Sequence, residues 1–215
     1  VVTAHNCGRS IAVHCVTLAE LHFSLAALAD AGVRKGDRIE HASIADDHAI
    51  QRMAELGVTA VTQPQFIAER GDQYLNDVEA EDVPLLYRGK SFLDCGVSLA
   101  AGSDSPYGSL NPWLAMQAAV KRQTGSGVVM AAEECLSSLQ ALSLFGGSAH
   151  HPGSGLREIA VGQPADLCLL DVPWERLVND LSAAHVRLTL RAGSVIYRNP
   201  ESHLTQSGFT VEELS

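Results

Sequence analysis

The stretch LAAGSDSPYGSLNPW, residues 99–113, decides the fold class. Its first residues continue an apolar run, 97–101, which is typical of a strand buried on both faces. A carboxylate, Asp104, follows that run, and Asn111 before Pro112 is typical of a helix start. An acid between a buried strand and a helix indicates a βα loop, where functional groups of parallel α/β proteins gather.

The same order of strand and helix recurs upstream. Apolar runs predict strands at residues 10–16, 37–43, 58–64 and 97–104. Helical spacing and end signals predict helices at residues 18–32, 46–57, 85–96, 111–122 and 131–149. A polar stretch, 68–82, is expected to be a loop. Strands that alternate with helices indicate parallel βαβ units, so the fold class is α/β.

The pattern changes toward the C-terminus. A strand is predicted within residues 162–171, and alternating residues over 186–198 predict a hairpin that turns at Ala192-Gly193. We therefore expect three segments, namely a βα domain over 1–155, a β-rich segment over 156–200 and a tail over 201–215.

Composition limits the classes of partner. The 215 residues are 46% hydrophobic and carry a net charge of −10, which argues against nucleic acid or an anionic membrane as partner. Five scattered cysteines contain no CxxC pair, so neither a disulfide framework nor a zinc ribbon is expected. Together with the lack of an apolar run of transmembrane length or a signal peptide, this favours a cytoplasmic location.

Three metal-ligand side chains lie near the ends of the predicted strands. The first strand carries His14, the second His41, and the fourth is followed by Asp104. If these strands are neighbours, the side chains meet at one edge of the sheet, and imidazole and carboxylate suit a divalent metal such as zinc. Taken singly, each has an ordinary alternative, because a histidine can be a bonded core residue and an aspartate a turn or helix cap.

Several motifs together resemble the amidohydrolase superfamily, and within it the amidohydrolase-3, or YtcJ-like, branch. They are VHCV, RIEHAS, VTQPQF, AAGSDSPYG, and GQPADLCLLD followed by LRAGSVIY. The resemblance implies a metal-dependent hydrolase on a (β/α)₈ TIM barrel. This chain would then hold barrel strands five to eight plus part of the small β-sandwich domain that accompanies the barrel.

The resemblance also implies roles for individual residues. His14 and His41 match the histidines of strands five and six, which ligate metal, and the second contacts substrate in one-metal members. Asp104 matches the strand-eight aspartate, which ligates metal and takes a proton from the attacking water. His41 and Asp104 are therefore the expected catalytic residues, and one or two divalent ions, with zinc the expected metal, would be the cofactor.

Four further residues are candidates for contact with substrate. Gln63 ends the third strand and Arg88 follows the long polar stretch, so both are candidate substrate-binding residues. Phe66 and Tyr107 are candidates for an apolar wall, although loop packing explains them equally well. A surface position on a helix is the alternative for Arg88.

The expected reaction is hydrolysis of a carbon–nitrogen bond other than a peptide bond, by water that the metal activates. Members of the family carry an HxH pair on strand one and usually a lysine or glutamate ligand on strand four, and this chain has neither. We therefore expect an incomplete portion of a longer enzyme, inactive by itself. Its expected partners are a small amide-like substrate and, through open strand edges, further copies of the chain.

Two other classes of function remain open. The first is a non-catalytic or degenerate binding subunit. The second is an iron oxygenase, because two histidines and one carboxylate also form its facial triad. In this chain the candidate ligands are 27 and 63 residues apart on successive βα units (41 − 14 and 104 − 41), whereas oxygenases usually have a compact His-x-Asp/Glu pair.

Overall fold

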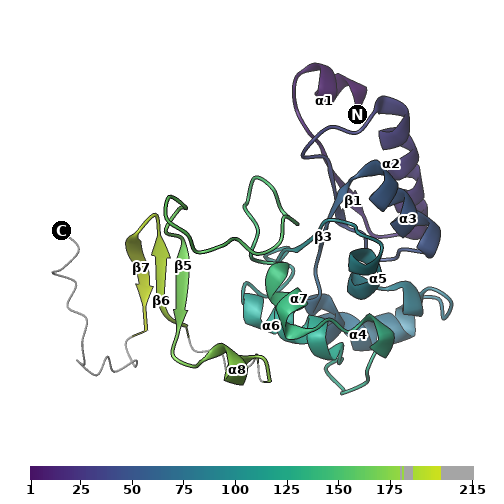
Figure 1. Cartoon of the computed structure of the whole chain (residues 1–215). Coiled ribbons are helices and arrows are strands. Elements are labelled where there is room, and N and C mark those ends of the chain that lie inside the picture. Colours follow the sequence, from purple (N-terminus) through teal and green to yellow (C-terminus); the bar gives the residue numbers. More distant parts are fainter. Residues whose placement is uncertain (180, 182–185, 200–215) are drawn as a thin grey trace, which may run out of the picture. The chain divides into compact units, whose positions relative to one another are not determined.

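The computed structural model (Figure 1) describes residues 1–179, 181 and 186–199. The chain divides into two compact units, Val1–Arg157 and Glu158–Ser215. The tail expected over 201–215 lies outside the described residues.

The first unit is built on a four-stranded parallel sheet with the order β1-β2-β3-β4. Its strands are β1 Ala12–Cys15, β2 Arg38–His41, β3 Thr59–Thr62 and β4 Leu99–Ala101. Consecutive strands are neighbours and helices separate them, so the predicted parallel βαβ arrangement is confirmed. All four strands therefore end at the same edge of the sheet.

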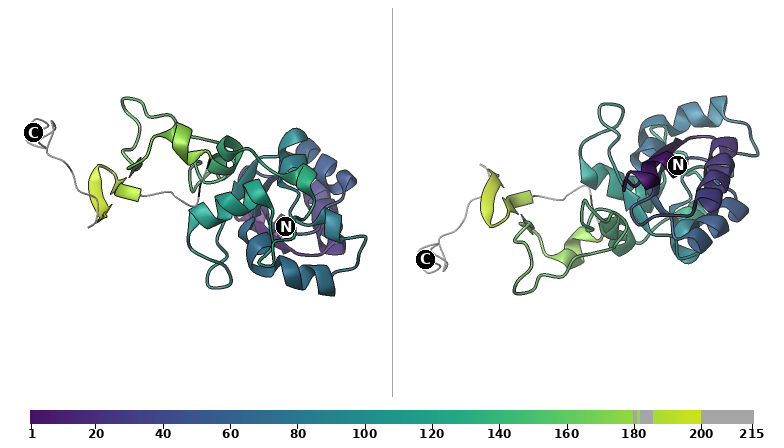
Figure 2. Two further views of the ribbon diagram at one scale, coloured as in Figure 1. Left: turned by 90° about the horizontal axis from the view of Figure 1, so that it is seen from below. Right: turned by 90° about the horizontal axis from the view of Figure 1, so that it is seen from above.

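Helices surround these strands (Figure 2). The α-helices are α1 Val2–Asn6, α2 Leu18–Ala31, α3 Asp47–Leu56, α4 Gln65–Asp77, α5 Gly89–Asp94, α6 Pro112–Lys121 and α7 Ser138–Ser143. Two short 3₁₀ turns accompany them, η1 Val83–Leu85 and η2 Ala132–Glu134. The buried core lies between helices and sheet, where Leu21, Leu28, Ile39, Met53 and Phe92 have no exposed surface.

The ends of helices follow local signals in the sequence. Thr17 and Glu20 form a reciprocal capping box at the start of α2. The Asp46 side chain accepts a hydrogen bond from the Ala49 N–H at the start of α3, and Gly57 ends that helix in the left-handed conformation. The predicted start and end of this second helix are confirmed.

Two predictions about helices are wrong. Most of the polar stretch expected to be a loop is helix α4, Gln65–Asp77, which buries Phe66, Ile67 and Gly71. Gly71 packs closely against Thr124, because an added Cβ would lie 2.5 Å from the Thr124 Cγ2 atom. Tertiary packing of one narrow face therefore stabilises a helix whose sequence is mostly polar. The long helix expected over 131–149 is reduced to η2 and the single short helix α7.

The second unit contains an antiparallel sheet with the order β5-β6-β7. Its elements are β5 Leu167–Leu170, α8 Trp174–Leu177, β6 Val186–Arg191 and β7 Ser194–Arg198. The predicted hairpin is confirmed, and both turn residues have positive φ, 48° at Ala192 and 79° at Gly193, as a two-residue hairpin turn of type I′ requires. Among the described residues, no helix has the length and apolar character needed to cross a membrane.

Candidate active site

A pocket of about 510 Å³ lies at the carboxyl edge of the parallel sheet. It brings together His14 from β1, His41 from the last position of β2, and Asp104 from the segment after β4. The two aromatic residues expected to form a wall, Phe66 and Tyr107, also line this pocket. The strand-end pattern thus places three candidate ligands around one cavity.

The two pocket histidines contact each other and differ in burial. Their rings meet edge to face with 4.5 Å between centroids. His14 is exposed, whereas His41 is buried, with 8% of its surface accessible. One imidazole is therefore fixed by the protein and the other is open to the cavity.

Gln63 orients the buried imidazole of His41. The His41 Nδ1 atom lies 2.8 Å from Gln63 Oε1, and Gln63 Nε2 donates to the Val61 carbonyl at 3.3 Å. Because Oε1 can only accept, Nδ1 is the donor in this contact, and Nε2 is then the nitrogen that has the lone pair in the neutral ring. This is the arrangement found in metal-ligating histidines, whose second nitrogen donates to a carbonyl or carboxylate.

Backbone strain gathers around the same cavity. Three non-glycine residues of the pocket lining have positive φ, namely His41 at 70°, Tyr87 at 50° and Asp104 at 51°, and so does Ala42, which follows His41, at 46°. This left-handed region is uncommon for residues with a side chain, and such residues cluster at functional sites. At His41 and Asp104 the strained backbone belongs to the candidate catalytic residues themselves.

The loop that presents Asp104 is held from below. Gln65 is almost fully buried, and its Nε2 donates to the carbonyls of Gly102 at 3.0 Å and Ser103 at 3.1 Å. Gly108 closes the loop without space for a side chain, because an added Cβ would lie 2.4 Å from the Ser103 carbonyl oxygen. These contacts restrict where the carboxylate can reach.

A pair of tyrosines forms another side of the pocket. The Ser43 hydroxyl donates to the Tyr87 hydroxyl at 3.2 Å, and the Tyr74 hydroxyl lies 3.2 Å from the same oxygen. Burial raises the pKa of Tyr87, and the adjacent Tyr74 raises it further. Tyr87 therefore stays a neutral phenol and is a structural and hydrogen-bonding group rather than a base.

The two residues expected to bind substrate lie away from the cavity surface. Gln63 is buried and bonded to His41, and it does not line the pocket. Arg88 also lies outside the lining, and its guanidinium forms ion pairs with Asp47 at 2.7 Å and Glu134 at 3.1 Å. Their substrate-binding roles stay predictions, and the observed contacts favour structural roles.

A different arginine lies in the pocket. Arg70 of α4 has its Cζ atom 4.2 Å from the centre of the Phe66 ring, and it donates to the Tyr107 carbonyl at 2.5 Å. Among the described residues, it is the one Lys or Arg that lines this cavity. Arg70 lies in the stretch expected to be a loop, and only its place on helix α4 indicates that it reaches the pocket.

The donor chemistry of the pocket suits a divalent metal, but its three candidate ligands are not tightly clustered. Among the described residues, one group of three has ligand atoms that all lie within 4.8 Å of one another. It consists of His22, Asp46 and His48, which lie outside this pocket. The pocket therefore offers ligand types that fit a metal, with a spacing that leaves room for further donors.

A family model described as the amidohydrolase family matches residues 1–197. The chain belongs to the amidohydrolase family. The resemblance inferred from the short motifs is thereby confirmed, since it extends over both units rather than over isolated stretches.

Two individual relatives agree with this family assignment. The chain is 34% identical over 138 residues to an N-substituted formamide deformylase of Arthrobacter pascens, covering 62% of this chain and 26% of that protein. It is 26% identical over 203 residues to a putative amidohydrolase, YtcJ, of Bacillus subtilis strain 168, covering 90% of this chain and 38% of that protein. The chain thus spans about a quarter to two-fifths of the length of these amidohydrolases.

A solved structure supports the fold assignment. An uncharacterized metal-dependent hydrolase from Pyrococcus horikoshii OT3 superposes with a TM-score of 0.59 at 29% identity. The match covers 66% of this chain and 29% of the hydrolase. The fold of this amidohydrolase chain is therefore that of metal-dependent hydrolases.

Proposed function

We propose that this chain supplies the catalytic aspartate and two histidine ligands of a metal-dependent hydrolase that cleaves amide-type carbon–nitrogen bonds. One observation carries the proposal: the hydrogen bond between His41 Nδ1 and Gln63 Oε1 leaves Nε2 as the candidate ligand atom, beside a cavity that His41 shares with His14 and Asp104. The named activity of the Arthrobacter relative, removal of a formyl group from substituted formamides, supports the substrate class.

We further propose that the parallel sheet is the second half of a (β/α)₈ barrel, and that the antiparallel sheet is part of a flanking β-sandwich. Within the described residues, β1 and β4 are the two edges of the sheet and each pairs on one side. Further strands at these edges would close the barrel and supply the remaining ligands. The short coverage of the relatives supports this reading.

His14, His41 and Asp104 are the residues that would hold the metal, and zinc fits two imidazoles and a carboxylate. The chemistry that a divalent ion would supply there is polarisation of the scissile carbonyl and a lowering of the pKa of water to about 7. The chain's own residues then orient the reactants. His41 is oriented by Gln63, and Phe66, with Arg70 stacked on it, bounds the cavity.

Asp104 is the proton carrier in this mechanism. Its carboxylate accepts the proton of the water that attacks the carbonyl carbon, and the carbon–oxygen bond forms as that proton leaves. The same proton then passes from Asp104 to the departing nitrogen as the carbon–nitrogen bond breaks. A loop pinned by Gln65 keeps the carboxylate within one region of the cavity during both transfers.

The proposal is tested with the full-length protein that carries these residues, assayed on a panel of N-acyl and formamide substrates. Treatment with a chelator should abolish turnover, and added Zn²⁺ should restore it without any requirement for O₂. Turnover that consumes O₂ and needs iron would support the oxygenase alternative. Absence of turnover in metal-loaded protein on the whole panel would support the binding-subunit alternative.

The two pocket histidines should be needed for metal retention. We expect His14→Ala and His41→Ala each to lower the metal content of the purified full-length protein, since each change removes one imidazole from the cavity. Elemental analysis after dialysis measures this directly. His150→Ala is the matched control, because that histidine is exposed and outside the pocket. Unchanged metal in both pocket variants would place the metal site elsewhere.

Gln63 should act through His41 and not through substrate. Gln63→Leu removes the acceptor of the Nδ1 proton and should weaken metal affinity by about 10–100-fold, the usual effect of losing such a partner. Gln63→Glu keeps an acceptor and should restore most of the affinity. Competition with a chromogenic chelator gives the affinities. A change in KM alone, with metal affinity intact in the Leu variant, would instead favour the substrate-binding role.

A further inference from the structure

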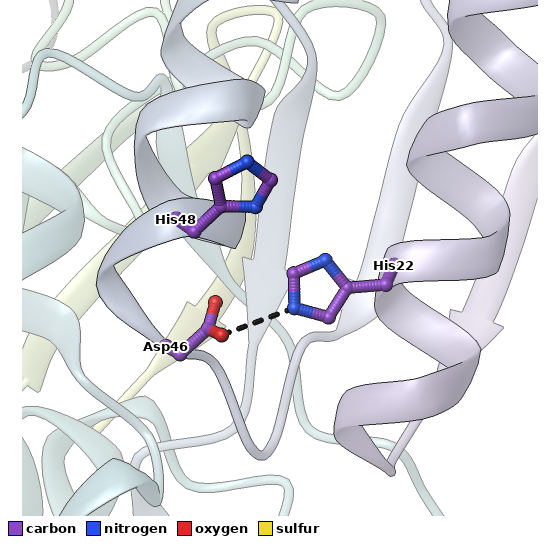
Figure 3. Close-up of side chains that lie close together, drawn as sticks. All are labelled: His22, Asp46 and His48. Carbon is purple, nitrogen blue, oxygen red and sulfur yellow. Dashed lines mark hydrogen bonds and ion pairs between the residues drawn. The ribbon is translucent and has the colours of Figure 1, made fainter.

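A second cluster of metal-ligand side chains lies between helices α2 and α3 (Figure 3). His22 comes from α2, Asp46 is the residue before α3, and His48 lies in the first turn of α3. One ligand atom from each residue lies within 4.8 Å of the others, and the three side chains converge on a common space. None of the three lines the pocket that contains His14 and Asp104.

The ligand atoms of His22 and Asp46 in this cluster hydrogen-bond to each other, and a bound ion would take the place of the proton between them. Asp46 uses Oδ1 to accept the Ala49 N–H at 2.7 Å, which leaves Oδ2 directed at His22. The His22 Nε2 atom lies 3.1 Å from Asp46 Oδ2. The rings of His22 and His48 lie 5.4 Å apart and are tilted by 30°, so neither blocks the other. Helix capping therefore fixes the orientation of the carboxylate independently of any ion.

The donor set determines the class of ion. Imidazole and carboxylate ligands suit zinc, and imidazole also suits copper(II) and nickel(II). Calcium and magnesium prefer oxygen donors alone. Three protein donors leave a fourth position for water. The side chains of His22 and Asp46 are 37% and 35% exposed, so the ion can enter and leave without unfolding of the chain.

We propose that His22, Asp46 and His48 form a second divalent-metal site, which takes zinc and ties α2 to α3. These two helices follow β1 and β2, the strands that carry His14 and His41. An ion at this site therefore cross-links the two βα units that present the pocket histidines. The bound ion would stabilise these two βα units. This proposal does not depend on the proposed hydrolase function.

The test is zinc binding by the metal-free full-length protein, measured by titration calorimetry and equilibrium dialysis. Wild-type protein should bind one more equivalent of Zn²⁺ than His48→Gln or His22→Gln, because each variant lacks one of the three protein ligands. His150→Gln, which changes an exposed histidine outside the cluster, should match the wild type. Equal stoichiometry and affinity in wild type, His22→Gln and His48→Gln would overturn the site.

A second measurement separates this site from the pocket. Cu²⁺ titrated to saturation into the His14→Ala, Asp104→Asn double variant should give an electron paramagnetic resonance component with coupling to two imidazole nitrogens. That component should be missing from the spectrum of the variant in which His22 and His48 are also replaced by glutamine. Identical spectra of the two variants at every Cu²⁺ equivalent would refute the proposal. Loss of hydrolysis in the double variant with retained Zn²⁺-induced thermal stabilisation would concern the pocket alone.

Discussion

If the proposed function holds, replacing Asp104 by asparagine should lower the kcat of the full-length protein by about 10²–10⁴-fold, the range expected for loss of a general base. The amide has nearly the shape of the carboxylate but cannot accept the proton of the attacking water. The side chain lines the pocket with both histidines, and its backbone has a φ of 51°, which asparagine also tolerates. Steady-state kinetics at saturating substrate measure the effect.

Two controls make the Asp104 result specific. In the metal-free form, the circular dichroism and the thermal midpoint of Asp104→Asn should match those of the wild type, since the loop is held by Gln65 and not by the carboxylate. Asp94→Asn, at an exposed carboxylate on α5, should keep normal kcat. A near-normal kcat in Asp104→Asn would show that the residue is a structural cap and would remove the base from the proposed mechanism.

Replacing Arg122 by methionine should lower the free energy of unfolding by about 3 kcal/mol or more, since charged hydrogen bonds are lost and carbonyls are left unsatisfied. The arginine is 3% exposed, and its guanidinium donates to the carbonyls of Met130 at 2.7 Å, Tyr87 at 2.6 Å and Leu86 at 2.8 Å. Methionine fills a similar volume but donates nothing. Urea denaturation of the full-length protein measures the loss.

The matched control for Arg122 is Arg52→Met on α3. Arg52 forms an exposed ion pair with Glu55, three residues along the same helix, so its loss should change stability by less than about 1 kcal/mol. Because Arg122 also fixes the carbonyls of two pocket-lining residues, Leu86 and Tyr87, its replacement should impair turnover as well. Equal stability of the two variants would mean that water replaces the guanidinium at no cost.

Local sequence signals were sufficient where the structure depends on neighbours along the chain. Asp46 and Gly57 mark the two ends of α3 because a cap and a left-handed glycine act within one turn. The hairpin turn at Ala192-Gly193 follows from the two-residue spacing between alternating runs. Asp104 after an apolar strand indicated the functional edge of the sheet, and the structure places it in the pocket with His14 and His41.

Those signals failed where packing between distant segments decides. The polar composition of 68–82 indicated a loop, yet α4 forms there because Phe66, Ile67 and Gly71 pack against the rest of the unit. Arg70 reaches the pocket as a consequence of that helix. Arg88 forms ion pairs with Asp47 and Glu134 and does not line the pocket, and its substrate-binding role stays a prediction.

The sequence by itself determined the alternation of strands and helices, the edge at which His14, His41 and Asp104 emerge, and the family. These features follow from periodicity, from strand direction and from short motifs, all of which depend on residues close together in the sequence. Only the tertiary structure decided that Gln63 orients His41 and that His22 meets Asp46 and His48. Such contacts join residues more than 20 positions apart, and their distances depend on how whole helices and strands pack.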